Sequence, residues 1–135
     1  MSETSQRREP AIRVIMMPKD TNALGTIFGG LILSYIDQAG AVEAHRYTPG
    51  RLVTVAMHEV EFHAPVFVGD LVSFYTETIE VGKTSVTVKV MVEAVRQTQT
   101  RERVAVTNAE VVYVHVDEQI RPQPLPLTRP DYSGS

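Results

Sequence analysis

The chain has 135 residues, 43% of them hydrophobic and 21% charged, which predicts one folded domain and excludes a largely disordered protein. The formal net charge of −3 excludes a global attraction to nucleic acid. With no cysteine, the chain lacks disulfides, thiolate metal ligands and a cysteine nucleophile, which fits a cytoplasmic location.

The first expected elements are a tail, a short strand and a loop. Residues 1–10 are polar and contain no apolar run suited to a signal peptide, and no stretch of the sequence is apolar enough to span a membrane. Residues 11–17 are mostly apolar and indicate a first strand. Residues 20–26 then predict a polar loop, which contains Asn22.

Only one segment, residues 29–47, is long and periodic enough to predict a helix. It begins at the pair Gly29-Gly30 and is ended by Pro49-Gly50. Its apolar side chains recur at spacings of three and four residues, as expected for a helix that packs on one face. They are Leu31, Ile32, Tyr35, Ile36, Ala39 and Val42.

The rest of the domain reads as strands. Alternating or β-branched runs predict four of them, at 51–62, 71–81, 85–95 and 103–116, which we expect to be antiparallel and joined by short turns. In the first of these the alternation shifts before Val60, which indicates a bulge. From Gln119 onward the chain holds four of its eight prolines and is expected to be irregular. We therefore expect a domain at 11–117 with irregular tails at 1–10 and 118–135.

A run of strands after a single helix is typical of the α+β class rather than of a parallel α/β sheet. One sheet and one helix can bury their apolar faces only if the sheet wraps around the helix. The edge strands of such a sheet would remain open to pairing, so we expect a dimer.

The side chain best suited to chemistry is that of Asp37, in the middle of the expected helix. On a helix it shares a face with residues that are apolar or small. They are Leu33, Gly40, Ala41 and Ala44. Asp37 is then either an ordinary solvated acid or a partly desolvated general base with space beside it for a substrate.

Two features near the expected helix start also suit chemistry. First-turn amides lack partners within a helix and carry the positive end of its dipole. At Gly29 and Gly30 these amides either allow close packing or donate to the oxyanion of a tetrahedral intermediate. Asn22 is either a turn-forming residue or one that orients water or a carbonyl group.

Basic residues gather around the last two strands. They are either a solvated rim or a group that holds phosphates with the help of hydroxyls. The set is Lys83 beside Thr84 and Ser85, followed by Arg96, Arg101 and Arg103. The histidines, at positions 45, 58, 63 and 115, form no ligand pair at helical spacing, and the motifs of serine hydrolases, P-loop proteins and dinucleotide enzymes are absent.

Several segments together resemble the cytosolic acyl-CoA hydrolase family of hotdog thioesterases, over residues 11–117. They are Met17-Pro18, residues 20–23, 27–30 and 35–40, Val53-Thr54-Val55, residues 62–65, Val68-Gly69-Asp70 and the hairpin 81–85. The resemblance implies the hotdog fold, in which a five-stranded antiparallel sheet wraps around the helix. It also implies a homodimer with active sites at the subunit interface, often assembled into a hexameric trimer of dimers.

The resemblance assigns roles as well. The family's catalytic acid falls on Asp37, and its active-site asparagine falls on Asn22, expected from the opposite subunit. The amide donor falls at Gly29 or Gly30. The hairpin Lys83-Thr84-Ser85 matches a region associated with coenzyme A binding.

We therefore predict an acyl-CoA thioesterase that releases a carboxylic acid and coenzyme A. Asp37 acts as general base or as nucleophile, and Asn22 positions the water. Coenzyme A is part of the substrate, and we expect no metal or other cofactor and no nucleic-acid or membrane partner. One alternative is a non-catalytic acyl-CoA sensor. Another is a dehydratase, which needs a histidine beside the acid; only His45 shares the expected helix.

Overall fold

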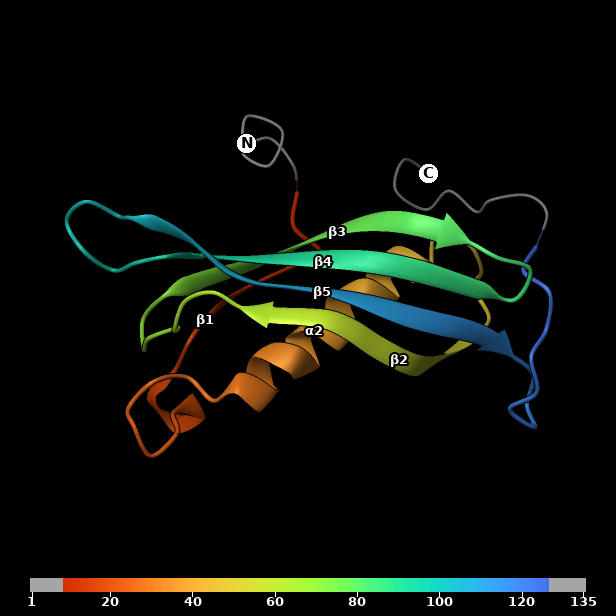
Figure 1. Cartoon of the computed structure of the whole chain (residues 1–135), viewed down its shortest axis with the longest axis horizontal. Coiled ribbons are helices and arrows are strands. Elements are labelled where there is room, and N and C mark those ends of the chain that lie inside the picture. The colour runs from red at the N-terminus through yellow and green to blue at the C-terminus, as the bar shows by residue number, and fades with distance from the viewer. Residues whose placement is uncertain (1–8, 127–135) are drawn as a thin grey trace.

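The computed structural model describes residues 9–126, and its elements follow the predicted order (Figure 1). After strand β1 (Ile12–Ile15) and a 3-10 turn at Pro18–Asp20, which was not predicted, the chain forms helix α2 (Gly29–Ala44). α2 therefore ends at Ala44 rather than at Tyr47. Four strands complete the chain: β2 (Arg51–Phe62), β3 (Leu71–Val81), β4 (Ser85–Val95) and β5 (Arg103–Val116).

The strands form one antiparallel sheet of five, in the order β1-β3-β4-β5-β2. The pairs β3–β4 and β4–β5 are hairpins, as the expectation of short turns required. β2 and β3 differ from that expectation, because β2 pairs with β5 and residues 63–70 cross the structure to reach β3. This segment is anchored by packing: Val66 is buried, and its carbonyl oxygen accepts the amide of Ile27 at 2.8 Å.

The core lies between α2 and the inner face of the sheet, which wraps around the helix (Figure 1). The alternation predicted for β4 is confirmed, since every second residue from Val86 to Ala94 is buried. Val42, assigned by its spacing to the apolar face, is instead 44% exposed. The buried residues of α2 are Ile32, Ile36, Ala39, Gly40 and Ala44. The predicted α+β architecture, one antiparallel sheet around one helix, is confirmed.

β2 is an edge strand of 12 residues whose pairing with β5 is interrupted twice. One interruption lies between His58 and Glu61, where Glu59 has a φ of 57°. It is the bulge that the shifted alternation predicted. The other, between Thr54 and Ala56, was not predicted. Within the described residues nothing pairs with the outer side of β2, so its amides and carbonyls are open to another strand.

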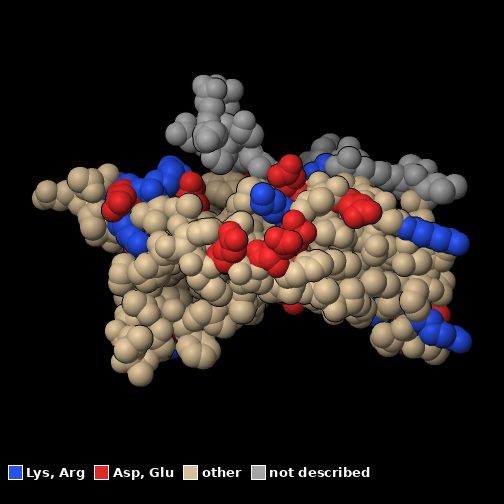
Figure 2. Space-filling model, viewed as in Figure 1, with Lys and Arg blue, Asp and Glu red and all other residues tan. Residues whose placement is uncertain are grey.

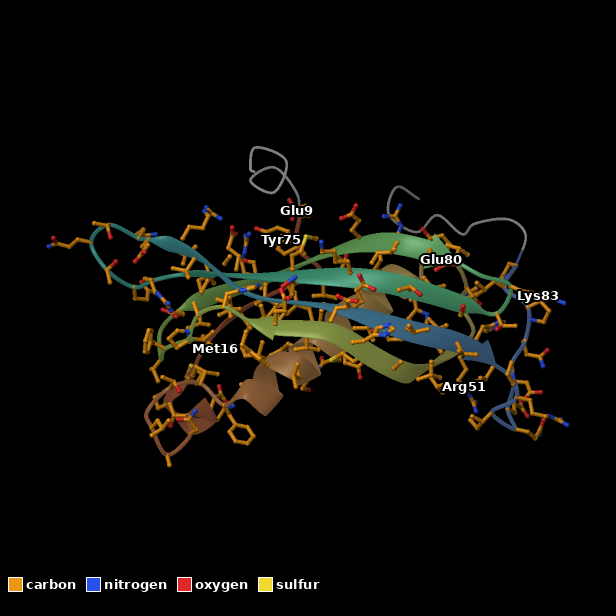
Figure 3. The ribbon with its side chains drawn as sticks, viewed as in Figure 1. Glu9, Met16, Arg51, Tyr75, Glu80 and Lys83 are labelled. Carbon is orange, nitrogen blue, oxygen red and sulfur yellow. The ribbon has the colours of Figure 1, made fainter. Side chains whose placement is uncertain are left out.

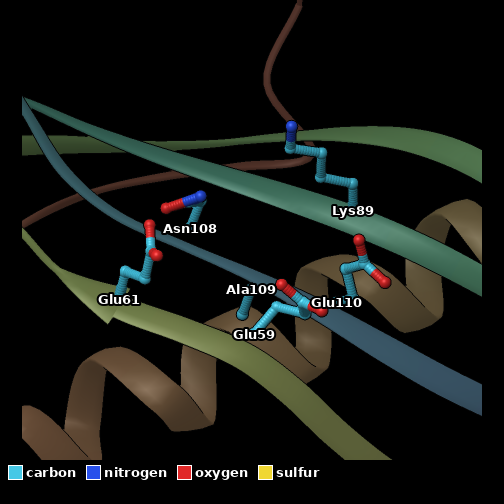
Figure 4. Close-up of a pocket in the computed structure, with 6 residues that line it drawn as sticks. All are labelled: Glu59, Glu61, Lys89, Asn108, Ala109 and Glu110. Atoms are coloured by element: carbon cyan, nitrogen blue, oxygen red, sulfur yellow. The ribbon is translucent and has the colours of Figure 1, made fainter.

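The outer face of the sheet carries many of the charged side chains (Figure 2). Figure 4 shows a shallow hollow there, with α2 behind the sheet. The hollow is lined by Glu59, Glu61, Lys89, Asn108, Ala109 and Glu110. Among residues 9–126 no group of three or more histidine, aspartate or glutamate side chains is placed to hold a metal ion. No helix in this part of the chain is long and apolar enough to cross a membrane.

The chain after β5 folds back on the domain instead of leaving it. The amide of Gln123 donates to the carbonyl oxygen of His115 at 2.8 Å, and the amide of Leu125 donates to that of Lys83 at 2.8 Å. The ring Nδ1 of His115 also lies 3.1 Å from the carbonyl oxygen of Pro124. The first part of the expected C-terminal tail is therefore held against the β3–β4 turn, whereas residues 127–135 lie outside the described chain.

Candidate active site

Asp37 lies halfway along α2 and is half-buried. Its carboxylate faces β2, where the hydroxyl of Thr54 donates to Oδ1 at 2.7 Å. Among residues 9–126 no donor lies within hydrogen-bond distance of Oδ2, although the Tyr113 hydroxyl also interacts with this carboxylate. One oxygen is thus held in place while the other can accept a proton from a water molecule, which is the arrangement that a general base needs.

Tyr113 of β5 holds the backbone of the same residue. Its side chain is 1% exposed, and its hydroxyl donates to the main-chain carbonyl oxygen of Asp37 at 2.6 Å. Burial, and then the nearby charge of Asp37, raise the pKa of Tyr113 well above its ordinary value. The hydroxyl therefore stays protonated and acts as a permanent donor.

Neither Thr54 nor Tyr113 was among the predicted site residues. The two are directly paired across β2 and β5, so their side chains lie on the same face of the sheet. The available signal in the sequence was the only aromatic residue of β5, set among aliphatic side chains. The position of Tyr113 in the sequence did not point to Asp37, because its place beside the helix becomes known only once β2 is paired with β5.

Gly40 corrects one sequence expectation. We expected the small residues beside Asp37 to leave space for a substrate. Instead, a Cβ built on Gly40 would lie 2.2 Å from the hydroxyl oxygen of Tyr113, so this space belongs to the tyrosine. A glycine inside a helix costs about 1 kcal/mol relative to alanine, and the hydrogen bond that it permits returns about as much.

The amides at the start of α2 are open. The amide of Phe28 donates to the carbonyl oxygen of Asp20 at 2.8 Å, and that of Leu31 donates to Phe28 at 3.0 Å. Within the described chain the amides of Gly29 and Gly30, which lie between them, have no hydrogen-bond acceptor. They carry the positive end of the helix dipole and suit an anionic oxygen.

Two aromatic side chains flank these amides. The ring of Phe62 lies 3.8 Å from the place where a Cβ of Gly29 would be, and the ring of Phe28 lies 3.1 Å from that of Gly30. Both rings are more than half exposed, at 53% and 58%. The two glycines therefore fit both of the predicted roles. They allow the aromatic rings to pack closely, and they leave the main-chain amides accessible to an oxyanion.

The amides and the carboxylate of one chain do not meet. Gly29 and Asp37 are eight residues apart on α2, which places them about 12 Å apart along the axis at 1.5 Å per residue. Reacting groups must approach to about 3–3.5 Å. A single copy therefore cannot direct its own Asp37 and its own first-turn amides at one acyl carbon.

Asn22 is committed to its own loop. Its Oδ1 accepts the amides of Leu24 at 2.9 Å and Thr26 at 3.2 Å, and its Nδ2 donates to the Thr26 hydroxyl at 2.9 Å. This is the turn-forming role that we weighed for an asparagine in such a loop. One amide hydrogen of Nδ2 stays available for another group, and the catalytic role of Asn22 stays a prediction.

The six predicted coenzyme A contacts form two groups rather than one. Lys83, Thr84 and Ser85 lie at the β3–β4 turn, and Figure 3 labels Lys83 at that end of the sheet. Arg96, Arg101 and Arg103 lie in and beside the β4–β5 turn. The 11 residues of β4 separate the groups, a length of roughly 35 Å at 3.3 Å per residue. The six residues therefore do not converge within one chain, and their role in coenzyme A binding stays a prediction.

Two of the three arginines already have structural partners. Arg96 forms an ion pair with the buried Asp70, and its guanidinium lies 4.7 Å from the ring centroid of Phe67. Arg103 Nη1 lies 2.6 Å from Glu93 Oε1. Among the described residues, neither Lys83 nor Arg101 has an ion-pair partner. Their charges are therefore better suited to a phosphate.

The histidines form contacts elsewhere. His45 and His115 contact Thr48, and His63 contacts Asn108 and Glu61. Among residues 9–126 none of the four histidines is hydrogen-bonded to Asp37. The pairing of a histidine with the acid that a dehydratase requires is not formed within one described chain.

A five-stranded antiparallel sheet wrapped around one helix, with an acid at mid-helix facing an edge strand, defines a hotdog-fold protein. A family model described as the thioesterase superfamily matches residues 24–101. The chain belongs to that family.

Similar proteins agree with this assignment. A hexameric hotdog fold thioesterase of Campylobacter jejuni is 43% identical, with a TM-score of 0.83 over 88% of this chain and 91% of that one. The hexameric broad specificity acyl-coenzyme A thioesterase HI0827, solved as an aspartate-to-alanine mutant enzyme, is 38% identical, with a TM-score of 0.84 over 88% and 87%. The acyl-CoA thioester hydrolase YciA of Escherichia coli is 40% identical over 118 residues, 86% of this chain and 89% of the relative.

Proposed function

We propose that this protein hydrolyses acyl-CoA thioesters to a carboxylic acid and coenzyme A, with Asp37 as the catalytic carboxylate. The observation that carries the proposal is the state of this side chain: half-buried, with Oδ1 held by Thr54 and Oδ2 open. The relatives named as acyl-CoA thioesterases support the choice of substrate. One of them has been solved with an aspartate replaced, which supports the importance of a carboxylate in this class.

The reaction begins with water. Asp37 Oδ2 takes one proton as the water oxygen bonds to the thioester carbon, and the carbonyl oxygen becomes an oxyanion. The oxyanion then reforms the double bond, the carbon–sulfur bond breaks, and the thiolate of coenzyme A takes up the proton held by Asp37, which regenerates the carboxylate. We favour this route over direct attack by Asp37, because the bond from Thr54 leaves one oxygen for water.

The donors to the oxyanion come from a second copy of the chain. Gly29 and Gly30 of that copy have open amides, whereas those of the same copy lie about 12 Å along the helix from Asp37. An oxyanion donor typically lowers the activation free energy by about 3 kcal/mol. Asn22 of the second copy would supply its remaining amide hydrogen to the water or to the carbonyl group.

We propose that the second copy pairs along the open edge of β2, in a dimer that assembles further into a trimer of dimers. The length of this unpaired edge supports the first step. The hexamers formed by the relatives from C. jejuni and HI0827 support the second. Lys83 and Arg101 then become the candidate contacts for the phosphates of coenzyme A. We also propose a cytoplasmic location for an enzyme acting on this substrate.

The test is a free-thiol assay on a panel from acetyl-CoA to palmitoyl-CoA. We expect turnover of at least one chain length, and a loss of at least 100-fold in kcat for Asp37→Ala. Glu118→Gln, which removes an exposed carboxylate outside the site, serves as the matched control and should keep full activity. Acyl-CoA binding without thiol release by the wild type would favour the sensor and overturn the proposal.

A further inference from the structure

Tyr113 stands in an unusual relation to α2. A main-chain carbonyl in the middle of a helix already accepts the amide four residues later, so it needs no additional donor. Asp37 nevertheless receives a second bond, at 2.6 Å, from the hydroxyl of Tyr113. At 1% exposure Tyr113 lies inside the core.

The sequence makes room for this contact at a single position. Gly40 is the only glycine of α2 beyond the first turn, and any larger residue there would bring a Cβ to 2.2 Å from the tyrosine hydroxyl and 3.0 Å from its ring. The helix is thereby held at a fixed height and rotation above β5, at the residue that carries the carboxylate.

The carboxylate itself is held from the neighbouring strand. Thr54 is the direct cross-strand partner of Tyr113, and the register shift between Thr54 and Ala56 follows at once. Bulges commonly re-aim side chains beside active sites. One rung of the sheet thus fixes both the main chain of Asp37, through Tyr113, and its Oδ1, through Thr54.

We propose that Tyr113 is a positioning residue for the hydrolysis, which acts by holding the main chain of Asp37 so that Oδ2 faces the attacking water. This inference rests on the proposed function. The contribution of Tyr113 is geometric, because its side chain is buried and its hydroxyl bonds to the main chain of Asp37. Its loss should therefore lower kcat and leave the binding of acyl-CoA almost unchanged.

The test is Tyr113→Phe, which removes the hydroxyl and keeps the ring. A misplacement of the base of about 1 Å can cost 100-fold in rate, and we expect kcat to fall about tenfold with KM changed less than about twofold. The matched control is Tyr75→Phe, because Tyr75 is also buried and its hydroxyl lies 3.4 Å from Arg13 on β1, away from α2. Tyr75→Phe should keep the wild-type kcat even where it lowers stability.

The outcomes separate this inference from the proposed function. Full kcat in Tyr113→Phe, alongside an inactive Asp37→Ala, would overturn the positioning role alone. Full activity in Asp37→Ala would overturn the proposed function itself. An equal fall in kcat for the Tyr113 and Tyr75 variants, tracking their loss of stability, would show that the hydroxyl of Tyr113 has only a structural effect. A double variant, Asp37→Ala with Tyr113→Phe, should be no slower than Asp37→Ala.

Discussion

Replacing Gly40 by alanine tests the packing that holds Asp37. The new methyl group would lie 2.2 Å from the hydroxyl oxygen of Tyr113, a distance that no real side chain tolerates, so the tyrosine must move. Overpacking of this kind costs about 1–3 kcal/mol, and the lost hydrogen bond costs about 0.5–1.5 kcal/mol. Alanine returns about 1 kcal/mol through its better helix propensity. The free energy of unfolding should therefore fall by about 1–3 kcal/mol.

The double variant makes this prediction specific. With Tyr113→Phe in place, the contact at 2.2 Å no longer exists and the nearest ring atom lies at 3.0 Å. Gly40→Ala should then cost at least about 1 kcal/mol less than in the wild type, as expected for two residues in contact. The assay is urea unfolding at one fixed protein concentration, because assembly also contributes to stability. Costs that add to within about 0.5 kcal/mol would refute the reasoning.

Three other substitutions test the site. Thr54→Val should lower kcat about tenfold in the free-thiol assay, whereas Thr54→Ser, which keeps the hydroxyl, should stay close to wild type; equal rates for the two would remove Thr54 from the account. Lys83→Gln should raise KM for acyl-CoA several-fold at unchanged kcat. The control Lys89→Gln, on the outer face of the sheet, should change neither constant. A KM unaffected by Lys83→Gln would contradict the role of Lys83 in phosphate binding. Tyr113 has a folded-state pKa raised above 10.0. Its stabilisation is therefore present below pH 10 and lost above it, by up to about 1.4 kcal/mol per pH unit, so Tyr113→Phe should show a shallower alkaline loss of stability than wild type, and identical slopes would count against the raised pKa.

The sequence predicted most of the fold because its signals were local. The alternating valines of β4 and the three- and four-residue spacing on α2 depend only on neighbouring positions, and they assigned the buried face correctly apart from the exposed Val42. The order of the strands depends on long-range pairing. The sequence suggested that residues 63–70 form part of a short connection between neighbouring strands. In the structure this segment, with Val66 buried, connects β2 at one edge of the sheet to β3 near the other edge.

The site was predicted less completely, for a related reason. Asp37 could be predicted because the small residues around it belong to the same helix, so their spacing in the sequence alone shows that they share a face. Its partners Thr54 and Tyr113 come from two strands, and only the pairing of β2 with β5 brings them to the same helix residue. Whether the basic residues converge also depends on long-range structure, and within one chain the length of β4 separates them into two groups.

The most direct test of the central claim is the turnover of Asp37→Asn, which keeps the shape of the side chain and the acceptor for Thr54 but removes the charge. We predict a fall in kcat of at least about 100-fold for the preferred acyl-CoA, with acyl-CoA still bound at nearly wild-type affinity. Thiol release within a few-fold of the wild-type rate would contradict the assignment of Asp37 as the catalytic carboxylate.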